Sequence, residues 1–218
     1  MAGFYRSTIG KKLVMAVSGL IIVGYLLTHV TANLMVFFAP DWLDAYAAFL
    51  KSMPFVIWPA RAVLLAAAVV HVVAATQLTL RNRAARPVGY QRRSPQAATW
   101  ASRSMRIGGV ILLVFIVLHI LHFTTGQLHP SAPDFNAHTV GWNVITAFRN
   151  GWVVLAYLVA MAALGLHLFH GLWSSTRTLG VNPESVQPQR RPIAAAIAAF
   201  LWLGFSIIPL GIFLGLVD

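Results

Sequence analysis

The sequence predicts an all-α membrane protein in which five transmembrane helices form one domain over residues 1–218. Hydrophobic residues make up 58% of the chain and charged residues only 10%, whereas soluble domains carry about 25% charged residues. Five apolar runs each reach the ~20 residues that a helix needs to cross the hydrocarbon core. Basic residues are concentrated in the segments that such a topology places on one side of the membrane.

The five runs cover residues 13–38, 56–80, 107–126, 150–174 and 193–216. Inside lipid the backbone must satisfy its own hydrogen bonds, so each run is expected to be a helix. The first run follows basic residues, as a signal peptide does, but it exceeds a signal's apolar length and no cleavage site closes it. We therefore expect a retained helix. In the second run Arg61 lies near the outer end, where it can snorkel.

The charge distribution predicts a cytoplasmic N-terminus. The inner segments then hold 13 basic residues, namely Arg6, Lys11, Lys12, the seven arginines from Arg81 to Arg106, Arg177, Arg190 and Arg191. The outer segments hold three, namely Lys51, Arg61 and Arg149. This split follows the positive-inside rule. The net charge of +11 is thereby explained without nucleic acid, which is not expected as a partner.

The connecting segments differ in character. Residues 40–54 are aromatic and acidic, which suits a short interfacial helix. Residues 127–148 are polar and contain two prolines, so they are expected to form the larger outer loop. Residues 81–104 are basic and are expected to face a partner or anionic lipid on the inner side.

Histidine is the candidate metal ligand. The chain has no cysteine, which excludes cysteine-ligated iron–sulfur clusters and c-type haem attachment. Six of the eight histidines lie within the apolar runs, namely His29, His71, His119, His122, His167 and His170. His129 and His138 lie in the outer loop and are expected to be solvated. One intramembrane histidine can be a packing residue, but four helices that each carry one indicate a function.

Depth below the outer membrane surface sorts the histidines into two layers. At 1.5 Å per residue, His29 lies about 16 Å deep and His119 about 10 Å deep. His71 lies about 21 Å deep and His167 about 26 Å deep, so the layers are roughly 10 Å apart. Each layer offers one imidazole from each of two helices, as bis-histidine ligation requires. The sequence therefore predicts two b-type haems in a four-helix core, with a fifth helix beside it.

Two further histidines leave alternatives open. His122 and His170 each lie one helical turn from a proposed ligand and on the same face. Depth does not decide which member of each H-x-x-H pair binds iron. The other member can bond a haem propionate, line a quinone pocket or cap a polar cluster.

The chain resembles the di-haem cytochrome b membrane-anchor subunit of bacterial succinate dehydrogenase (succinate:quinone oxidoreductase) and the related fumarate reductases. The resemblance rests on S-T-I-G-K-K at 7–12, L-T-H-V-T-A-N-L at 27–34, D-A-Y-A-A-F-L-K-S-M-P at 44–54, V-V-H at 69–71, S-R-S-M-R-I-G-G at 102–109, L-H-I-L-H-F-T at 118–124 and L-H-L-F-H-G-L-W-S at 166–174. These segments cover nearly the whole chain in order.

The resemblance implies four axial ligands, one from each of the first four helices. They fall on His29 and His119 for an outer haem and on His71 and His167 for an inner haem. It thereby favours His119 over His122 and His167 over His170 as ligands.

The resemblance also implies partners and a location. A flavoprotein subunit with FAD and an iron–sulfur subunit would dock on the cytoplasmic face of the bacterial inner membrane. Electrons would pass through the two haems to menaquinone or another quinone, so this chain lacks the succinate-oxidising site itself. Arg81, Arg103 and Arg106 are candidate contacts to propionates or to the iron–sulfur subunit, and positive-inside anchoring explains them equally well.

One departure concerns an outer quinone site, for which some relatives use a glutamate. The only glutamate here is Glu184, which is expected on the inner side. An outer site would have to rely on Asp41, Asp44, His122 or water.

Two other functions are compatible with buried histidines. One is the cytochrome b subunit of a hydrogenase, formate dehydrogenase or nitrate reductase. The other is a transporter with a histidine relay, which the shortage of intramembrane acids disfavours.

Overall fold

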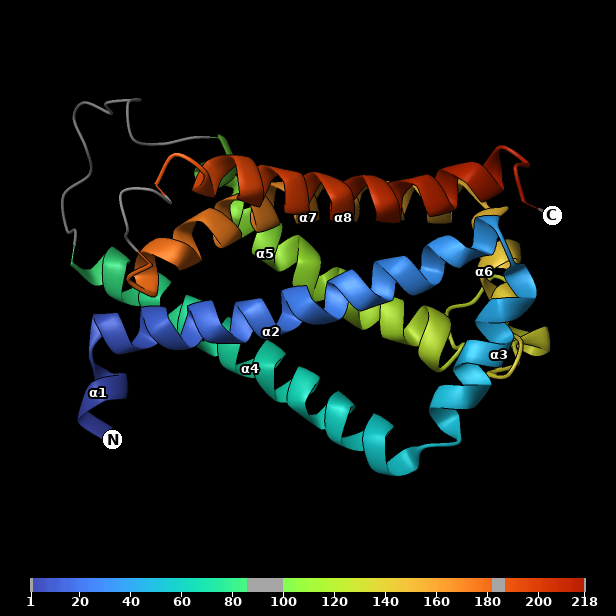
Figure 1. The fold of residues 1–218 in the computed structure, drawn as a ribbon, viewed down its shortest axis with the longest axis horizontal. Helices are drawn as coiled ribbons and strands as arrows, with labels where there is room; N and C mark the ends of the chain where they lie inside the picture. The colour runs from blue at the N-terminus through green and yellow to red at the C-terminus, as the bar shows by residue number, and fades with distance from the viewer. Residues whose placement is uncertain (1, 86–99, 182–186, 218) are drawn as a thin grey trace.

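Five long helices form a bundle in the computed structural model, which describes residues 2–85, 100–181 and 187–217 (Figure 1). The long helices are α2 (Thr8–Leu34), α4 (Pro54–Ala84), α5 (Trp100–His119), α7 (Gly151–Thr178) and α8 (Arg190–Phe213). Shorter elements are α1 (Ala2–Arg6), a 3-10 turn (Met35–Phe37), α3 (Pro40–Lys51), a π-helical turn (Ile120–Thr124), a second 3-10 turn (Ala132–Asp134) and α6 (Val140–Phe148). The five long helices are each long and apolar enough to cross a membrane.

Local sequence signals explain where several helices begin. The Ser7 side chain accepts a hydrogen bond of 2.9 Å from the Gly10 amide and caps α2, and Asn150 caps α7 by accepting from the Trp152 amide at 3.0 Å. Such caps satisfy backbone donors that have no partner inside the helix. Pro54 opens α4, a position where a missing backbone N–H costs nothing. All five long helices also extend past the apolar runs at their basic ends, where water can solvate the charged side chains.

Two neighbouring clusters form the interior. α7 packs along α8, α2 packs along α4, and α5 packs along α7. The first cluster joins α2, α7 and α8 through Val30, Ala160, Met161, Leu164, Leu168, Ala198 and Leu201. The second joins the end of the bundle next to α3 and α6 through Val36, Leu43, Val144, Phe148, Val154, Ile208 and Ile212. The fifth helix therefore holds α2 against α7.

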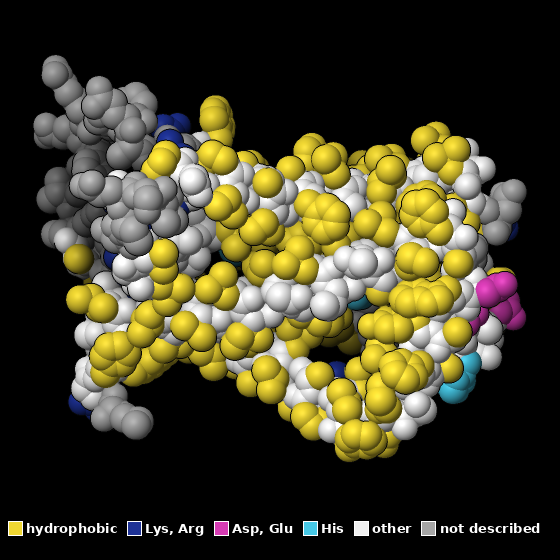
Figure 2. All heavy atoms as spheres, in the orientation of Figure 1, with side chains coloured by type: hydrophobic (Ala, Val, Ile, Leu, Met, Phe, Trp, Pro, Cys, Tyr) yellow, Lys and Arg dark blue, Asp and Glu magenta, His cyan; other side chains and the backbone are white. Residues whose placement is uncertain are grey.

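The surface of the bundle is mainly apolar along its length, as contact with lipid requires (Figure 2). Most basic side chains of the described residues lie at the end that carries the N-terminus, and the acidic side chains visible in Figure 2 lie at the end that carries α3 and α6. We call these the basic end and the α3–α6 end. Figure 2 also shows the surface hollowed between α2 and the part of α4 near α3.

The segment predicted as an outer loop, residues 127–148, contains a helix that the prediction missed. α6 (Val140–Phe148) buries one face, including Val144 and Phe148. The Asp44 carboxylate accepts a hydrogen bond of 2.9 Å from the Gly141 amide and thereby ties α3 to the start of α6. Residues 140, 144 and 148 are apolar and four apart, as on one face of a helix. The polar residues before them led us to predict a loop for the whole segment. The predicted short helix within residues 40–54 is present as α3, which covers Pro40–Lys51.

Candidate haem-binding sites

Two histidines meet near the α3–α6 end of the bundle. His29 lies on α2 and His119 is the last residue of α5. Their ring centres are 6.0 Å apart and the ring planes are at 85°. Both rings are only partly buried by protein. We call them the outer pair.

Two more histidines meet closer to the basic end. His71 on α4 and His167 on α7 have ring centres 6.2 Å apart with ring planes at 56°. Both rings are again only partly buried. We call them the inner pair. The structure therefore brings together the two members of each pair that the sequence predicts.

The helices that carry each pair are held apart. α2 does not pack closely on α5, nor α4 on α7, so the imidazoles meet across a space between helices. A metal–imidazole bond is about 2 Å long, so two imidazoles that bind one metal from opposite sides have ring centres roughly 6 Å apart. Among the described residues no three metal-ligating side chains gather. Two protein ligands per metal suit a haem, whose macrocycle supplies the other donors.

The ring nitrogens divide in a way that also fits haem. Within the described residues none of the four Nε2 atoms has a protein hydrogen-bond partner. The Nδ1 atom of His71 lies 3.0 Å from the Met15 carbonyl oxygen, and Nδ1 of His119 lies 3.1 Å from the Tyr157 hydroxyl. A partner on Nδ1 fixes the ring and leaves Nε2 available to a metal. His167 Nδ1 is buried without such a partner in the same part of the chain.

Residues of α2 also contact both pairs. His29 Nδ1 lies 3.5 Å from the Tyr25 hydroxyl, one turn away. Gly19 faces the inner pair, because a Cβ atom there would lie 3.1 Å from Cε1 of His71. Glycine at this position lets the imidazole approach the backbone of α2.

Gly19 and His29 relate the two pairs along α2. Gly19 beside the inner pair and His29 in the outer pair are ten residues apart on this helix, which is about 15 Å along its axis. Because α4 and α5 run obliquely to α2 (Figure 1), this length is not the depth difference between the two layers. The predicted separation of roughly 10 Å between the layers stays a prediction.

Neither His122 nor His170 is a member of either pair. His122 lies in the π-helical turn and is only 5% exposed. Its Nδ1 atom is 2.9 Å from the Tyr157 hydroxyl, while its Nε2 atom is buried without a partner in the described residues. His170 lies edge-on to Trp173 with ring centres 6.0 Å apart.

The expectation that His129 is solvated was wrong. Its side chain is 4% exposed. Its Nε2 atom lies 2.9 Å from the Asn143 carbonyl oxygen, and its Nδ1 atom accepts a hydrogen bond of 3.2 Å from the Ser131 amide. The reason is α6, which covers this part of the chain. His138 is exposed, as expected.

The predicted arginines lie at the basic end. Arg81 donates a hydrogen bond of 2.7 Å to the Arg6 carbonyl oxygen and so ties α4 to α1. Arg103 and Arg106 are exposed at the start of α5. The rest of the basic segment 86–99, like Glu184, lies outside the described residues.

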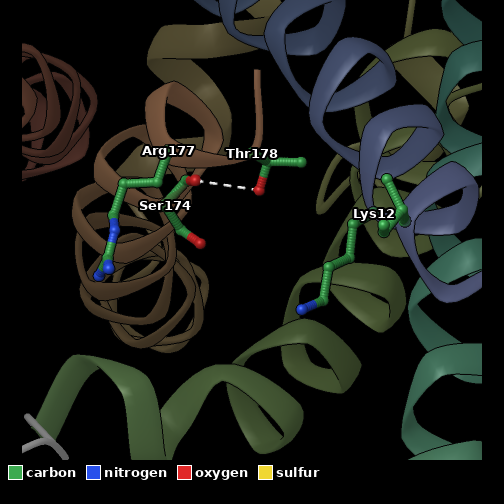
Figure 3. A pocket seen from close by; sticks show the side chains of 5 residues that line it. Lys12, Ser174, Arg177 and Thr178 are labelled. Atoms are coloured by element: carbon green, nitrogen blue, oxygen red, sulfur yellow. Dashed lines mark hydrogen bonds between the residues drawn. The ribbon is translucent and has the colours of Figure 1, made fainter. Parts of the chain in front are cut away.

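The basic end also contains a pocket between α2 and α7. It is lined by Ile9 and Lys12 from α2 and by Ser174, Arg177 and Thr178 from α7. Figure 3 shows the Lys12 ammonium group reaching into the space between the two helices, while the Arg177 side chain points away from Lys12. The Thr178 hydroxyl donates to the Ser174 carbonyl oxygen at 3.1 Å.

Tyr157 is the functional candidate that the sequence analysis missed. It lies in the first third of α7 and its hydroxyl contacts both His119 and His122. A tyrosine at membrane depth is a polar group that needs a partner, and this signal was present in the sequence. Only the packing of α7 against α5 shows which partners it has.

Comparison with known proteins gives one match. A family model described as "Succinate dehydrogenase/Fumarate reductase transmembrane subunit" matches residues 79–207, which is more than half of the chain. The matched region includes one member of each histidine pair, His119 and His167, together with Tyr157. No curated protein and no solved structure matches the chain.

Proposed function

The chain belongs to the succinate dehydrogenase/fumarate reductase transmembrane subunit family, and from this premise we propose that it is the di-haem, electron-carrying membrane anchor of such a complex. Membership in the family and five apolar helices make it a multi-pass membrane subunit. The proposal adds two b haems, a quinone substrate and the identity of the soluble partners. It also places the complex in the bacterial cytoplasmic membrane.

The observation that carries the proposal is the pairing of the histidines. His29 meets His119 and His71 meets His167, at ring separations of 6.0 and 6.2 Å. Each pair joins helices that do not pack closely on one another. Unpaired imidazole nitrogens inside a membrane are costly, so an arrangement that directs them toward a shared space calls for a ligand there.

The chain's own residues would hold and orient the cofactors. The Met15 carbonyl accepts from Nδ1 of His71, which stiffens the ring and raises its basicity as a ligand. Tyr157 holds His119 in the same way. Two haems bound at these pairs would supply one-electron redox centres between a soluble donor and a quinone.

The basic end is the surface that we assign to the partner subunits. Lys12, Arg103, Arg106 and Arg177 are exposed there, and the excess of basic residues supports a cytoplasmic location for this end. An iron–sulfur subunit, with a flavoprotein that carries FAD behind it, would dock on this face. Anionic lipid would share the remaining basic surface.

The quinone is proposed to be menaquinone, following the di-haem relatives that the sequence resembles. Asp44 is a weak candidate for proton handling at an outer quinone site, since its carboxylate already binds the Gly141 amide. Asp41 is exposed, whereas His122 is buried beside the outer pair. We therefore assign proton handling at an outer quinone site to His122 in preference to Asp41 and Asp44.

The test is spectroscopic and biochemical. The intact complex, purified from membranes in mild detergent, should give reduced-minus-oxidised spectra of b-type haem at about two per chain. It should also contain a flavoprotein and reduce a menaquinone analogue with succinate. A properly assembled complex without haem would refute the di-haem proposal. Co-purification with a hydrogenase, formate dehydrogenase or nitrate reductase in place of the flavoprotein would refute the partners.

A further inference from the structure

The Tyr157 hydroxyl lies between two histidines. It is 3.1 Å from Nδ1 of His119 and 2.9 Å from Nδ1 of His122. A phenol has one proton to donate and can accept from other donors. Tyr157 can therefore donate to only one of the two rings, and the other ring must donate to Tyr157.

The proposed function decides which ring does which. If His119 binds iron through Nε2, its ring proton is on Nδ1 and is donated to the Tyr157 oxygen. The Tyr157 proton is then donated to Nδ1 of His122. His122 in turn must carry its own proton on Nε2, since a neutral imidazole has one N–H. One hydroxyl thus determines the tautomers of two histidines.

A separate observation on His122 points to a ligand beside it. Its Nε2 atom is buried and has no hydrogen-bond partner in the described residues, and the whole side chain is 5% exposed. A buried polar nitrogen without a partner lowers the stability of the fold, so we expect a ligand that is not part of the chain to bond it. The turn that carries His122 is π-helical, with the Thr125 amide donating to the Ile120 carbonyl oxygen at 3.0 Å, and such turns occur often at functional sites.

We propose that Tyr157 is a positioning residue that sets the tautomers of both His119 and His122. Through it His119 presents Nε2 to the outer haem, and His122 presents an Nε2–H as a hydrogen-bond donor. This inference rests on the proposed function, because it assigns His119 as a ligand.

The packing around Tyr157 allows the hydroxyl to be tested alone. Its ring meets Phe115 edge-on at 5.0 Å and Phe148 edge-on at 4.9 Å. These contacts do not involve the oxygen atom, so Tyr157→Phe keeps the aromatic packing and removes only the hydrogen bonds. Tyr5→Phe is the matched control, because the Tyr5 hydroxyl bonds Gln77 at the basic end, away from the outer pair.

The experiment is a potentiometric titration of the haem spectra in the intact complex. Removing the acceptor from Nδ1 makes an imidazole a weaker donor to ferric iron, so Tyr157→Phe should shift the midpoint potential of the outer haem to a more positive value. The inner haem should keep its potential, and Tyr5→Phe should change neither. An unshifted outer haem in a Tyr157→Phe complex that retains both haems would overturn the inference and leave the proposed function standing.

A second measurement covers the case in which Tyr157→Phe loses the outer haem. Redox-induced infrared difference spectra of the complex with 13C-labelled tyrosine should show a tyrosine C–O band that changes when the outer haem is reduced. The band should survive Tyr25→Phe, which removes the only other tyrosine hydroxyl beside a proposed ligand among the described residues. Absence of the band would overturn the inference. Absence of the outer haem from the unmodified complex would instead overturn the proposed function.

Discussion

The Nδ1 atom of His71 on α4 lies 3.0 Å from the backbone carbonyl oxygen of Met15 on α2. A carbonyl oxygen can only accept, so the ring proton of His71 is on Nδ1 and its Nε2 lone pair is free. This hydrogen bond joins α2 and α4, which pack along one another. It also leaves Nε2 as the nitrogen of His71 that can bind a metal, as the orienting partner of a metal-binding histidine commonly does.

Replacement of the inner pair should remove one haem selectively. In His71→Ala or His167→Ala the inner haem loses an axial ligand, so the haem content of the purified complex should fall from about two per chain to about one. His29→Ala and His119→Ala should remove the outer haem with the same stoichiometry. Low-temperature optical spectra distinguish the two haems. Loss of the same spectral component in His71→Ala and His29→Ala would contradict the pairing.

His122 should be dispensable for haem retention. It is outside both pairs, and its Nδ1 is directed at Tyr157. His122→Ala should therefore keep both haems, whereas His119→Ala should lose the outer one, as measured by haem content per chain. The opposite result, with haem lost in His122→Ala and kept in His119→Ala, would show that the assignment of ligands on α5 is wrong.

Gly19 should be required for the inner haem. A Cβ atom there would lie 3.1 Å from Cε1 and 3.3 Å from Nδ1 of His71, so Gly19→Val should push the ring away from the Met15 carbonyl. Loss of such an orienting contact commonly weakens metal binding about 10- to 100-fold. The measurement is the fraction of inner haem retained after purification.

Gly24→Val is the matched control for this substitution. Gly24 lies on the same helix, and a Cβ atom there would meet nothing within 4 Å. The control should keep full inner haem. Equal loss of inner haem in the two variants would mean that valine damages α2 in general, and that Gly19 has no special relation to His71.

Gly204 should be required for the docking of the fifth helix. A Cβ atom there would lie 2.7 Å from Cγ2 of Val30, which is fully buried. Gly204→Ala should destabilise the bundle by about 1–3 kcal/mol, the usual cost of overpacking a core. Thermal unfolding in detergent measures this cost. Gly171→Ala, where a Cβ atom meets nothing within 4 Å, should leave the midpoint temperature unchanged.

Much of the fold was predictable because lipid imposes simple rules. A spanning segment must be helical and about 20 residues long, so the five apolar runs located the five long helices. The short α6 was missed, because the helix is only nine residues long and follows a polar stretch. His129 was then misjudged as solvated, since its burial depends on that helix.

From the sequence alone we predicted that histidines lie at membrane depth on four helices, and that His29 shares a layer with His119 and His71 with His167. Hydropathy and helical rise are local properties, so counting residues was enough for both. The packing of the helices, which the sequence does not show, brings the rings of each pair to 6.0 and 6.2 Å across helices that do not pack together. It also gives Nδ1 of His71 and Nδ1 of His119 their partners, and it places one Tyr157 hydroxyl against both His119 and His122. Such contacts depend on how α5 and α7 lie against each other, and no spacing along a single helix contains that information.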